Sequence, residues 1–360
     1  MRLLRLDVEG FRSIDALSWR PGDVTVLTGP RADDLCAAAM HVANTAGGWS
    51  AFAEGFAEEP PHPKGRFTDG FGETRCFARL GPGEAESLCF GYELLIERIE
   101  QNNAWAIVYE RFTLDDDFEL KELLERQGSR AVFTPSPRRA ARAGERPPKE
   151  QVVQVAEDMS SLGAIPSLAS DPRVEPYAER LGGWRRHGRV DPSPAGAPRR
   201  FEAERLFHDR LSADGRNLAN ALYSLWDIEA LRAPVLAGLR VLDPTVEGLS
   251  FPAVDERGMT VALVHADGRV TPLAAMGDEA VAWLLRGAML CGVSPAPLLV
   301  IDAAQADLPE AMLGPLAAMI RGGAARAQVV LTGVAPALDA ALDAAFGPEG
   351  DGPRLVRSEV

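Results

Sequence analysis

The stretch DVTVLTGPRADDLCAAAMHVANTA, residues 23–46, places a short apolar segment, a turn and an alanine-rich segment in direct succession. Residues 23–28 are rich in β-branched and apolar side chains and predict a strand, and Gly29-Pro30 marks the turn. Residues 33–46 begin with aspartate and continue with alanine, leucine and methionine at helical spacing, which predicts a helix. Strand, turn and helix in this order indicate the start of an α/β unit.

The C-terminal part of the chain continues the same pattern. Short apolar strands alternate with helices there, which is typical of a parallel sheet covered by helices. The predicted strands are residues 297–302 and 327–332, and the predicted helices are residues 277–292, 309–322 and 335–346.

The region between these two ends has a different pattern. Alternating runs predict an N-terminal hairpin and a larger antiparallel sheet, and proline and arginine become dense after residue 130. The predicted elements are strands at 3–8, 12–19, within 74–113 and within 246–272, and helices at 116–127, near 150–162, at 172–182 and at 214–232. We therefore predict three parts: 1–128 with the antiparallel sheet, an arginine- and proline-rich helical insertion at 129–210, and 211–360.

Composition argues against a membrane-spanning protein and against a chain that attracts nucleic acid through its overall charge. The chain has 360 residues, 46% hydrophobic content and a net charge of −14, so an attraction to nucleic acid would need a local basic patch. No apolar run reaches the ~18 residues that span a bilayer, and the N-terminus lacks the pattern of a signal peptide. We expect a cytoplasmic protein without membrane contact. The four cysteines are scattered, and we expect buried, reduced thiols rather than disulfides or a metal site.

Four sequence segments occur in an order that can be compared with known protein families. They are VEGFRSI (8–14), LSADGRNLANALYSL (211–225), PLLVIDAA (297–304) and AQVVLTGVAPALD (327–339). In this order they resemble the RecF/SMC branch of ABC-type ATPases, and most of all the bacterial "predicted ATPase" type that is akin to OLD-family proteins. The resemblance implies a P-loop NTPase fold of the ABC/SMC-head type, with a mixed central sheet, an antiparallel β subdomain and a helical insertion.

The phosphate-binding loop of that family aligns with residues 29–36, and most of its functional groups are replaced. The aligned residues are Gly29, Pro30, Arg31, Ala32, Asp33, Asp34, Leu35 and Cys36. The lysine that grips phosphate is Leu35, and the Mg²⁺-binding hydroxyl is Cys36, whose soft sulfur suits Mg²⁺ poorly. Asp33 and Asp34 would repel a phosphate by about 4 kcal/mol at ~4 Å and an effective dielectric near 20. We expect Asp33 to cap the helix, so that the protein's own carboxylate fills the phosphate position.

The remaining family motifs are altered in the same way. The resemblance aligns Asp302 with the Mg²⁺-holding aspartate, Ala303 with the glutamate that positions the attacking water, and Val334 with the switch histidine. Gly277-Asp278 aligns with the signature loop. Asp302 is the only candidate for a Mg²⁺ ligand, and a plain hydrogen bond at the end of a strand explains it equally well. We expect no cofactor and no metal, with ATP and Mg²⁺ as the less favoured outcome.

Arginines form two further clusters. The first contains Arg138, Arg139 and Arg142, and the second contains Arg185, Arg186 and Arg189. They predict a phosphate-backbone contact or, more simply, loop charges that pair with this acidic protein. We expect a pseudo-ATPase that acts as a non-catalytic partner of an active ATPase, of a nuclease or of a second copy, in DNA repair or phage defence. The alternatives are a divergent working ATPase and a nucleic-acid-binding module.

Overall fold

The computed structural model describes most of the chain in two compact units, which we treat separately. The first contains the described residues up to Pro21 and from Gly29 to Trp184, with Val360; the second contains Gly22–Thr28 and Arg185–Glu359. The predicted insertion at 129–210 is shared between both, since the division follows Trp184. The described residues are 2–47, 73–81, 88–99, 104–116, 119–134, 150–169, 171–200, 203–204, 208–254, 258–347 and 352–360.

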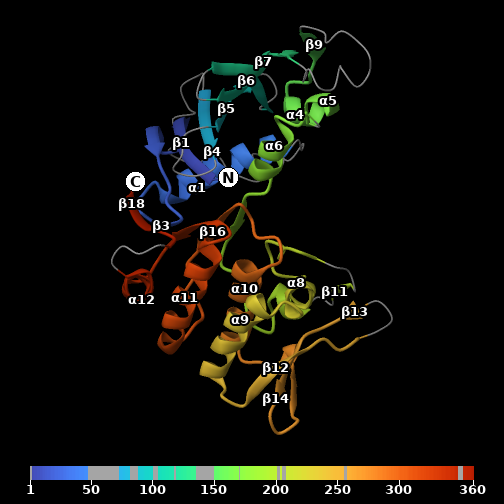
Figure 1. The fold of residues 1–360 in the computed structure, drawn as a ribbon, viewed down its shortest axis with the longest axis vertical. Coiled ribbons are helices and arrows are strands. Elements are labelled where there is room, and N and C mark those ends of the chain that lie inside the picture. The colour runs from blue at the N-terminus through green and yellow to red at the C-terminus, as the bar shows by residue number, and fades with distance from the viewer. Residues whose placement is uncertain are drawn as a thin grey trace. The chain divides into compact units, whose positions relative to one another are not determined.

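An antiparallel sheet of eight strands dominates the first unit (Figure 1). Its order is β2-β1-β4-β5-β6-β7-β8-β9, so neighbours in the sheet are mostly neighbours in the chain. This confirms the predicted hairpin and antiparallel sheet. The strands are β1 (Arg2–Phe11), β2 (Ile14–Trp19), β4 (Glu73–Gly81), β5 (Leu88–Ile99), β6 (Ala104–Asp116), β7 (Glu119–Gln127), β8 (Arg130–Phe133) and β9 (Gln151–Gln154).

The described residues of this unit contain one long helix and three short ones. Alanine and glycine let two of them approach closely: an added Cβ on Gly182 would lie 3.1 Å from the Cα of Gly47, directly after α1. They are α1 (Ala32–Ala46), α4 (Ser161–Ala164), α5 (Pro166–Ala169) and α6 (Glu175–Gly182). Helix α1 confirms the helix predicted at 33–46, and α6 confirms the one at 172–182.

Strand β7 overturns the helix predicted for residues 116–127. Glutamate, leucine and lysine favour a helix in isolation, but pairing with β6 and β8 overrides that weak preference. A register shift opposite Phe112 and Thr113 lets the consecutive Leu123 and Leu124 both become buried. The helix predicted near 150–162 is also wrong in its first part, since Gln151–Gln154 extends the sheet by pairing with β8.

A buried ion pair ties the sheet of the first unit to the segment after β9. Arg126 and Glu110 have no exposed side-chain surface, and their closest charged atoms lie 3.6 Å apart. The Glu110 carboxylate accepts hydrogen bonds from Tyr92 Oη (3.0 Å) and from the backbone N–H of Ser161 (2.8 Å). Arg126 donates to the carbonyls of Gly128, Ala156 and Met159. Every strong polar group of the pair therefore has a partner, as burial of two charges requires.

A five-stranded parallel sheet forms the frame of the second unit. Its order is β10-β16-β17-β3-β18, and β3, β16 and β17 are almost wholly buried. The predicted strands at 23–28, 297–302 and 327–332 and their parallel pairing are confirmed. The outer strand β18 was not among the predicted elements. The strands are β3 (Val24–Thr28), β10 (Arg185–His187), β16 (Leu298–Asp302), β17 (Gln328–Thr332) and β18 (Leu355–Glu359).

Helices and small sheets complete the second unit, with α9, α10 and α11 side by side (Figure 1). The single helix predicted at 214–232 is two helices, because Ile228 has an extended backbone (ψ 102°) and interrupts the helical hydrogen bonds. The helices are α7 (Ala197–Arg200), α8 (Leu218–Trp226), α9 (Glu229–Leu242), α10 (Asp278–Cys291), α11 (Leu313–Ala324) and α12 (Pro336–Phe346), with 3₁₀ turns at Leu273–Ala275 and Glu310–Met312. The small sheets contain β11 (Ala203–Glu204) with β13 (Gly258–Met259), and β12 (Val246–Ser250) with β14 (Ala262–His265) and β15 (Val270–Pro272).

Most of the apolar core of this unit surrounds α10. Its Trp283, Leu284 and Leu285 have no exposed surface, and the Trp283 indole donates to the carbonyl of Val235 in α9 at 2.7 Å. An added Cβ on Gly238 would lie 2.0 Å from the Trp283 ring, so only glycine lets α9 approach it. None of the helices in the described residues has the length and apolar character to cross a membrane.

Candidate functional site

The loop that aligns with a phosphate-binding loop is short. Strand β3 ends at Thr28 and helix α1 begins at Ala32, so only Gly29, Pro30 and Arg31 separate them. The backbone N–H of Leu35 already donates to the carbonyl of Arg31 at 2.9 Å, as in a regular helix. Leu35 and Cys36 lie inside α1 with 0% and 2% exposure. The two side chains at the lysine and hydroxyl positions thus face the apolar interior, where they have no access to a solvent-borne phosphate.

Gly29 is enclosed by the backbone of Val360. Its φ of +98° is a conformation that favours glycine, and an added Cβ would lie 2.1 Å from the Val360 carbonyl oxygen. The same oxygen accepts a hydrogen bond from the backbone N–H of Arg31 at 3.4 Å. A phosphate-binding loop turns its backbone N–H groups toward the ligand. Here the N–H of Arg31 is directed to a carbonyl of the same chain.

The predicted cap of α1 is wrong. Arg31 is the N-cap residue, no side chain accepts a capping hydrogen bond, and Asp33 lies within the first turn. Asp34 has a different role, because it holds the β1–β2 turn. Its carboxylate accepts from Ser13 N (3.2 Å), Ser13 Oγ and Arg12 Nη1 (3.2 Å).

Arg12 occupies a backbone conformation with φ +49°, and Asp34 compensates for that strain. Burial raises the pKa of Asp34, but the hydrogen bonds from Ser13 and Arg12 outweigh this effect and hold the pKa below its ordinary value of 3.8. The carboxylate is therefore ionised at neutral pH and already paired within the first unit.

In the second unit, Asp302 lies at the end of β16 and is also paired. Arg186 Nε donates to Asp302 Oδ2 at 2.9 Å, and Thr332 Oγ1 donates to Oδ1 at 2.6 Å. Arg186 comes from β10, which pairs with β16 in parallel. A guanidinium thus supplies the positive charge that a metal ion would bring to this carboxylate. The described residues contain no group of three or more His, Cys, Asp or Glu side chains that could hold a metal ion.

The positions next to Asp302 lack acid–base groups. Ala303 has a left-handed backbone (φ +47°), and its N–H donates to the carbonyl of Thr332 at 2.9 Å. Gly333 follows with φ +58°, and Gln305 Nε2 donates to its carbonyl at 2.8 Å. Val334 is partly buried against the apolar core. The side chains at the two positions predicted to align with a water-positioning carboxylate and a switch histidine are thus a methyl group and an isopropyl group, which cannot transfer protons.

The signature-like loop is fixed by another arginine. Gly277 is the N-cap of α10, and Arg199 Nη2 donates to the Asp278 carboxylate at 2.6 Å. The Arg199 side chain is 3% exposed and also donates to the carbonyls of Pro192 (2.7 Å) and Met276 (2.7 Å). The loop is thereby pinned to the segment 192–199 of the same unit.

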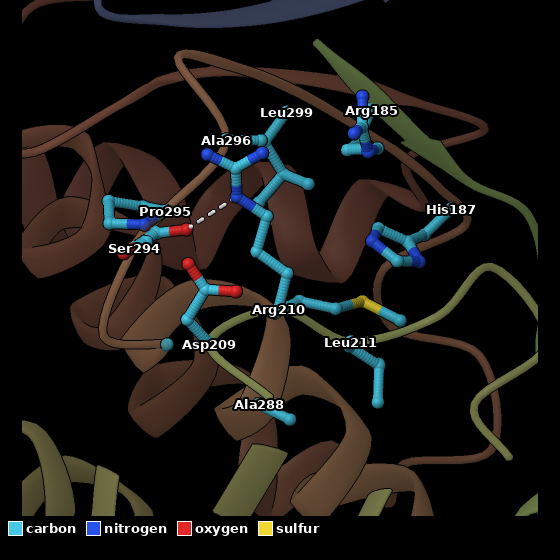
Figure 2. A pocket seen from close by; sticks show the side chains of 12 residues that line it. Arg185, His187, Asp209, Arg210, Leu211, Ala288, Ser294, Pro295, Ala296 and Leu299 are labelled. Atoms are coloured by element: carbon cyan, nitrogen blue, oxygen red, sulfur yellow. Dashed lines mark hydrogen bonds between the residues drawn. The ribbon is translucent and has the colours of Figure 1, made fainter. Parts of the chain in front are cut away.

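The three described arginines of the predicted nucleic-acid patch have different surroundings. Arg138, Arg139 and Arg142 lie outside the described residues. Arg186 pairs with Asp302, and Arg189 pairs with Asp307 at 2.5 Å. Arg185 lines a small pocket in the same unit (Figure 2). Because side chains alternate along a strand, Arg185 and Arg186 leave β10 on opposite faces.

Sequence reasoning missed the arginine partners of these carboxylates. Asp34, Asp278 and Asp302 are each held by an arginine that lies between 22 and 116 positions away in the chain. The motifs locate the carboxylates, whereas the β1–β2 turn brings Arg12 to Asp34, the pairing of β10 with β16 brings Arg186 to Asp302, and α7 brings Arg199 to Asp278. An excess of arginine over lysine was the one visible signal.

Comparison with known proteins gives matches among solved structures only. No family model matches the chain, and no curated protein matches it. The chain is similar to an Smc head bound to the C-winged helix domain of ScpA (12% identity, TM-score 0.47, covering 95% of this chain and 92% of that chain). It is also similar to the SMC head domain from Thermotoga maritima (11%, TM-score 0.40, 95% and 92%). A third similar structure is an Smc head domain with an extended coiled coil, bound to the C-terminal domain of ScpA derived from Pyrococcus furiosus (11%, TM-score 0.42, 94% and 91%).

Proposed function

We propose that this chain is a catalytically silent ABC-type ATPase-like head that serves as a non-catalytic or regulatory subunit of a bacterial complex. Its P-loop NTPase fold would be retained for assembly rather than for hydrolysis. The observation that carries the proposal is the pairing of Asp34, Asp278 and Asp302 with arginines of the chain itself. Three arginines of the chain thus pair with carboxylates that align with family motif positions. One of these carboxylates, Asp302, aligns with the aspartate that would hold Mg²⁺ in an active relative.

The chemistry of phosphoryl transfer supports this proposal. Catalysis of that reaction depends almost wholly on positioning the phosphates and neutralising their charge. Leu35 offers no charge, Cys36 is buried, and Ala303 cannot orient water. Restoring one group would leave the others missing, so we expect no measurable turnover rather than a slow enzyme.

The fold itself supports a role in assembly. Within the second unit the apolar strands β3, β16 and β17 are buried, and β16 and β17 lead directly to the altered positions Ala303 and Val334, so the framework is kept where catalytic groups are missing. A head of this kind could pair with an active ATPase, with a nuclease or with a second copy, in DNA repair or phage defence. An active ATPase in that role would supply the catalytic groups that this chain lacks.

The proposal is tested by calorimetric titration of the full chain with ATP and Mg²⁺, together with an assay of released phosphate. We expect neither saturable binding in the micromolar range nor turnover. Asp302→Ala should leave both results unchanged, and an active ABC-type ATPase serves as the positive control. Hydrolysis by the wild type that Asp302→Ala abolishes would instead make the chain a divergent working ATPase.

A further inference from the structure

A small pocket in the second unit has none of the altered motif positions among its described lining residues. It is lined by Arg185 and His187 of β10 and by Leu299 near the start of β16, whereas Asp302 is the last residue of β16. Figure 2 shows charged and polar side chains around it, together with apolar ones. The residues that matter here are Arg185, His187, Asp209, Arg210 and Ser294. The pocket leaves about 20 Å³ for the centre of a water-sized group, which is room for one such group.

His187 is a buried polar side chain with an unmet hydrogen bond. It is 4% exposed, and its Nδ1 has no hydrogen-bond partner among the described residues. Burial, followed by the charges of Arg286 and Arg185, lowers the pKa of His187 to about 4. The ring is therefore neutral at pH 7. A buried nitrogen without a partner is rare and costly, so a water molecule or a ligand atom is expected to complete its hydrogen bonding.

Two guanidinium groups stand at the same pocket. Arg210 Nε donates to the Ser294 carbonyl at 3.1 Å, and within the described part of the chain its two terminal nitrogens form no hydrogen bond. Burial and the neighbouring charge of Arg210 lower the pKa of Arg185. Asp209 is the one carboxylate in the lining, and it forms no ion pair with Arg210 among the described residues. Among the described lining residues, two guanidinium charges face one carboxylate charge, so this lining carries a net positive charge.

We propose that Arg185, His187 and Arg210 form a binding site for a terminal phosphate group. One phosphate oxygen would enter the pocket and meet His187, while the others would accept from the two guanidinium groups at the mouth. Guanidinium groups match the geometry of phosphate and carboxylate oxygens equally well. A phosphate at neutral pH carries both hydroxyl and oxyanion oxygens, so it can bond Nδ1 whichever ring nitrogen holds the proton. A carboxylate can only accept, which favours phosphate.

The experiment follows the His187 ring nitrogens of the full chain by long-range ¹⁵N–¹H NMR while sodium phosphate is added at constant ionic strength and pH. We expect a saturable shift of the Nδ1 resonance. Arg210→Gln and Arg185→Gln should each weaken binding at least about tenfold, since each removes a charged hydrogen-bond donor. Arg189→Gln is the matched control, because Arg189 pairs with Asp307 outside the pocket, and it should bind phosphate like the wild type.

Parallel titrations distinguish the sources of the phosphate group. Phenyl phosphate should shift the same resonance if the phosphate is presented by a larger molecule, and inorganic phosphate alone should do so if the site takes the free ion. Acetate should bind more weakly than either. Equal binding of acetate would overturn the choice of phosphate. No saturable shift, or an adventitious ion only, seen as an unchanged response in both folded arginine variants, would overturn the site.

Discussion

Two arginine–carboxylate pairs, one in each unit, show what burial does to the same chemistry. Glu110 and Arg126 have no exposed side-chain surface and form hydrogen bonds with four backbone groups, whereas Asp302 and Arg186 are 23% and 25% exposed. Removing one partner of a fully buried pair leaves an uncompensated charge in the protein interior. Removing one partner of a partly exposed pair leaves a charge that water can reach. We therefore expect the Glu110–Arg126 pair to contribute strongly to the free energy of unfolding. The Asp302–Arg186 pair should contribute little to it.

The comparison predicts its largest effect at Glu110. Glu110→Gln should lower the free energy of unfolding by about 3–5 kcal/mol, because Arg126 then stays buried without a counter-charge. Urea denaturation at neutral pH measures the change. Glu122→Gln, at an exposed position of β7, is the matched control and should change stability by less than about 0.5 kcal/mol. A loss at Glu110 as small as that of the control would break the comparison.

Asp34 should show an intermediate effect that depends on pH. Its pKa is lowered in the folded chain, so its stabilisation is fully present above the unfolded pKa, near 3.8, and is lost as the pH falls through the folded pKa. Urea denaturation of wild type and Asp34→Asn should therefore differ at neutral pH and converge in acid. Glu9→Gln, at an exposed position of β1, is the control and should change the free energy of unfolding at neutral pH by less than about 0.5 kcal/mol. A difference between wild type and Asp34→Asn that grows in acid would contradict the hydrogen bonds assigned to Asp34.

The smallest effect is expected at Asp302. Asp302→Asn should change the free energy of unfolding by no more than about 1 kcal/mol, because its ion pair with Arg186 is partly exposed and the amide can still accept from Thr332. The same denaturation experiment measures it, with Arg186→Gln as the reciprocal variant. A loss above about 3 kcal/mol in either variant would place this pair in the same class as Glu110 and Arg126.

The sequence pattern predicted the correct elements where apolar runs in the sequence coincide with strands that are buried in the structure. Strands β16 and β17 are continuous apolar runs between helices, and both were predicted within one residue of their observed limits. Residues 119–127 failed because their helix-forming side chains lie in a strand that β6 and β8 hold by backbone pairing. Local preference carries no information about a partner strand, so such a segment cannot be assigned from its own residues.

The candidate site shows the same limit. Motif spacing predicts which family positions Leu35, Ala303 and Val334 align with. Their side chains lack the charged and proton-transferring groups that the family uses at those positions. The partners of Asp34 and Asp302 could not be predicted, since Arg12 and Arg186 reach them only through a turn and a parallel strand pairing. Nor does any motif indicate the pocket at His187, where a buried ring nitrogen and two guanidinium groups meet.

Three consecutive side chains of β10 alternate between its two faces, one toward the pocket and the other toward Asp302. Arg185 and His187 contribute to the pocket, while the intervening Arg186 reaches Asp302 from the opposite face. A shift of one residue in the pairing of β10 with β16 would exchange the faces, removing the arginine from Asp302 and the histidine from the pocket at once. Insertions or deletions next to this strand should therefore be far less tolerated than substitutions within it, because a change in length alters both places together.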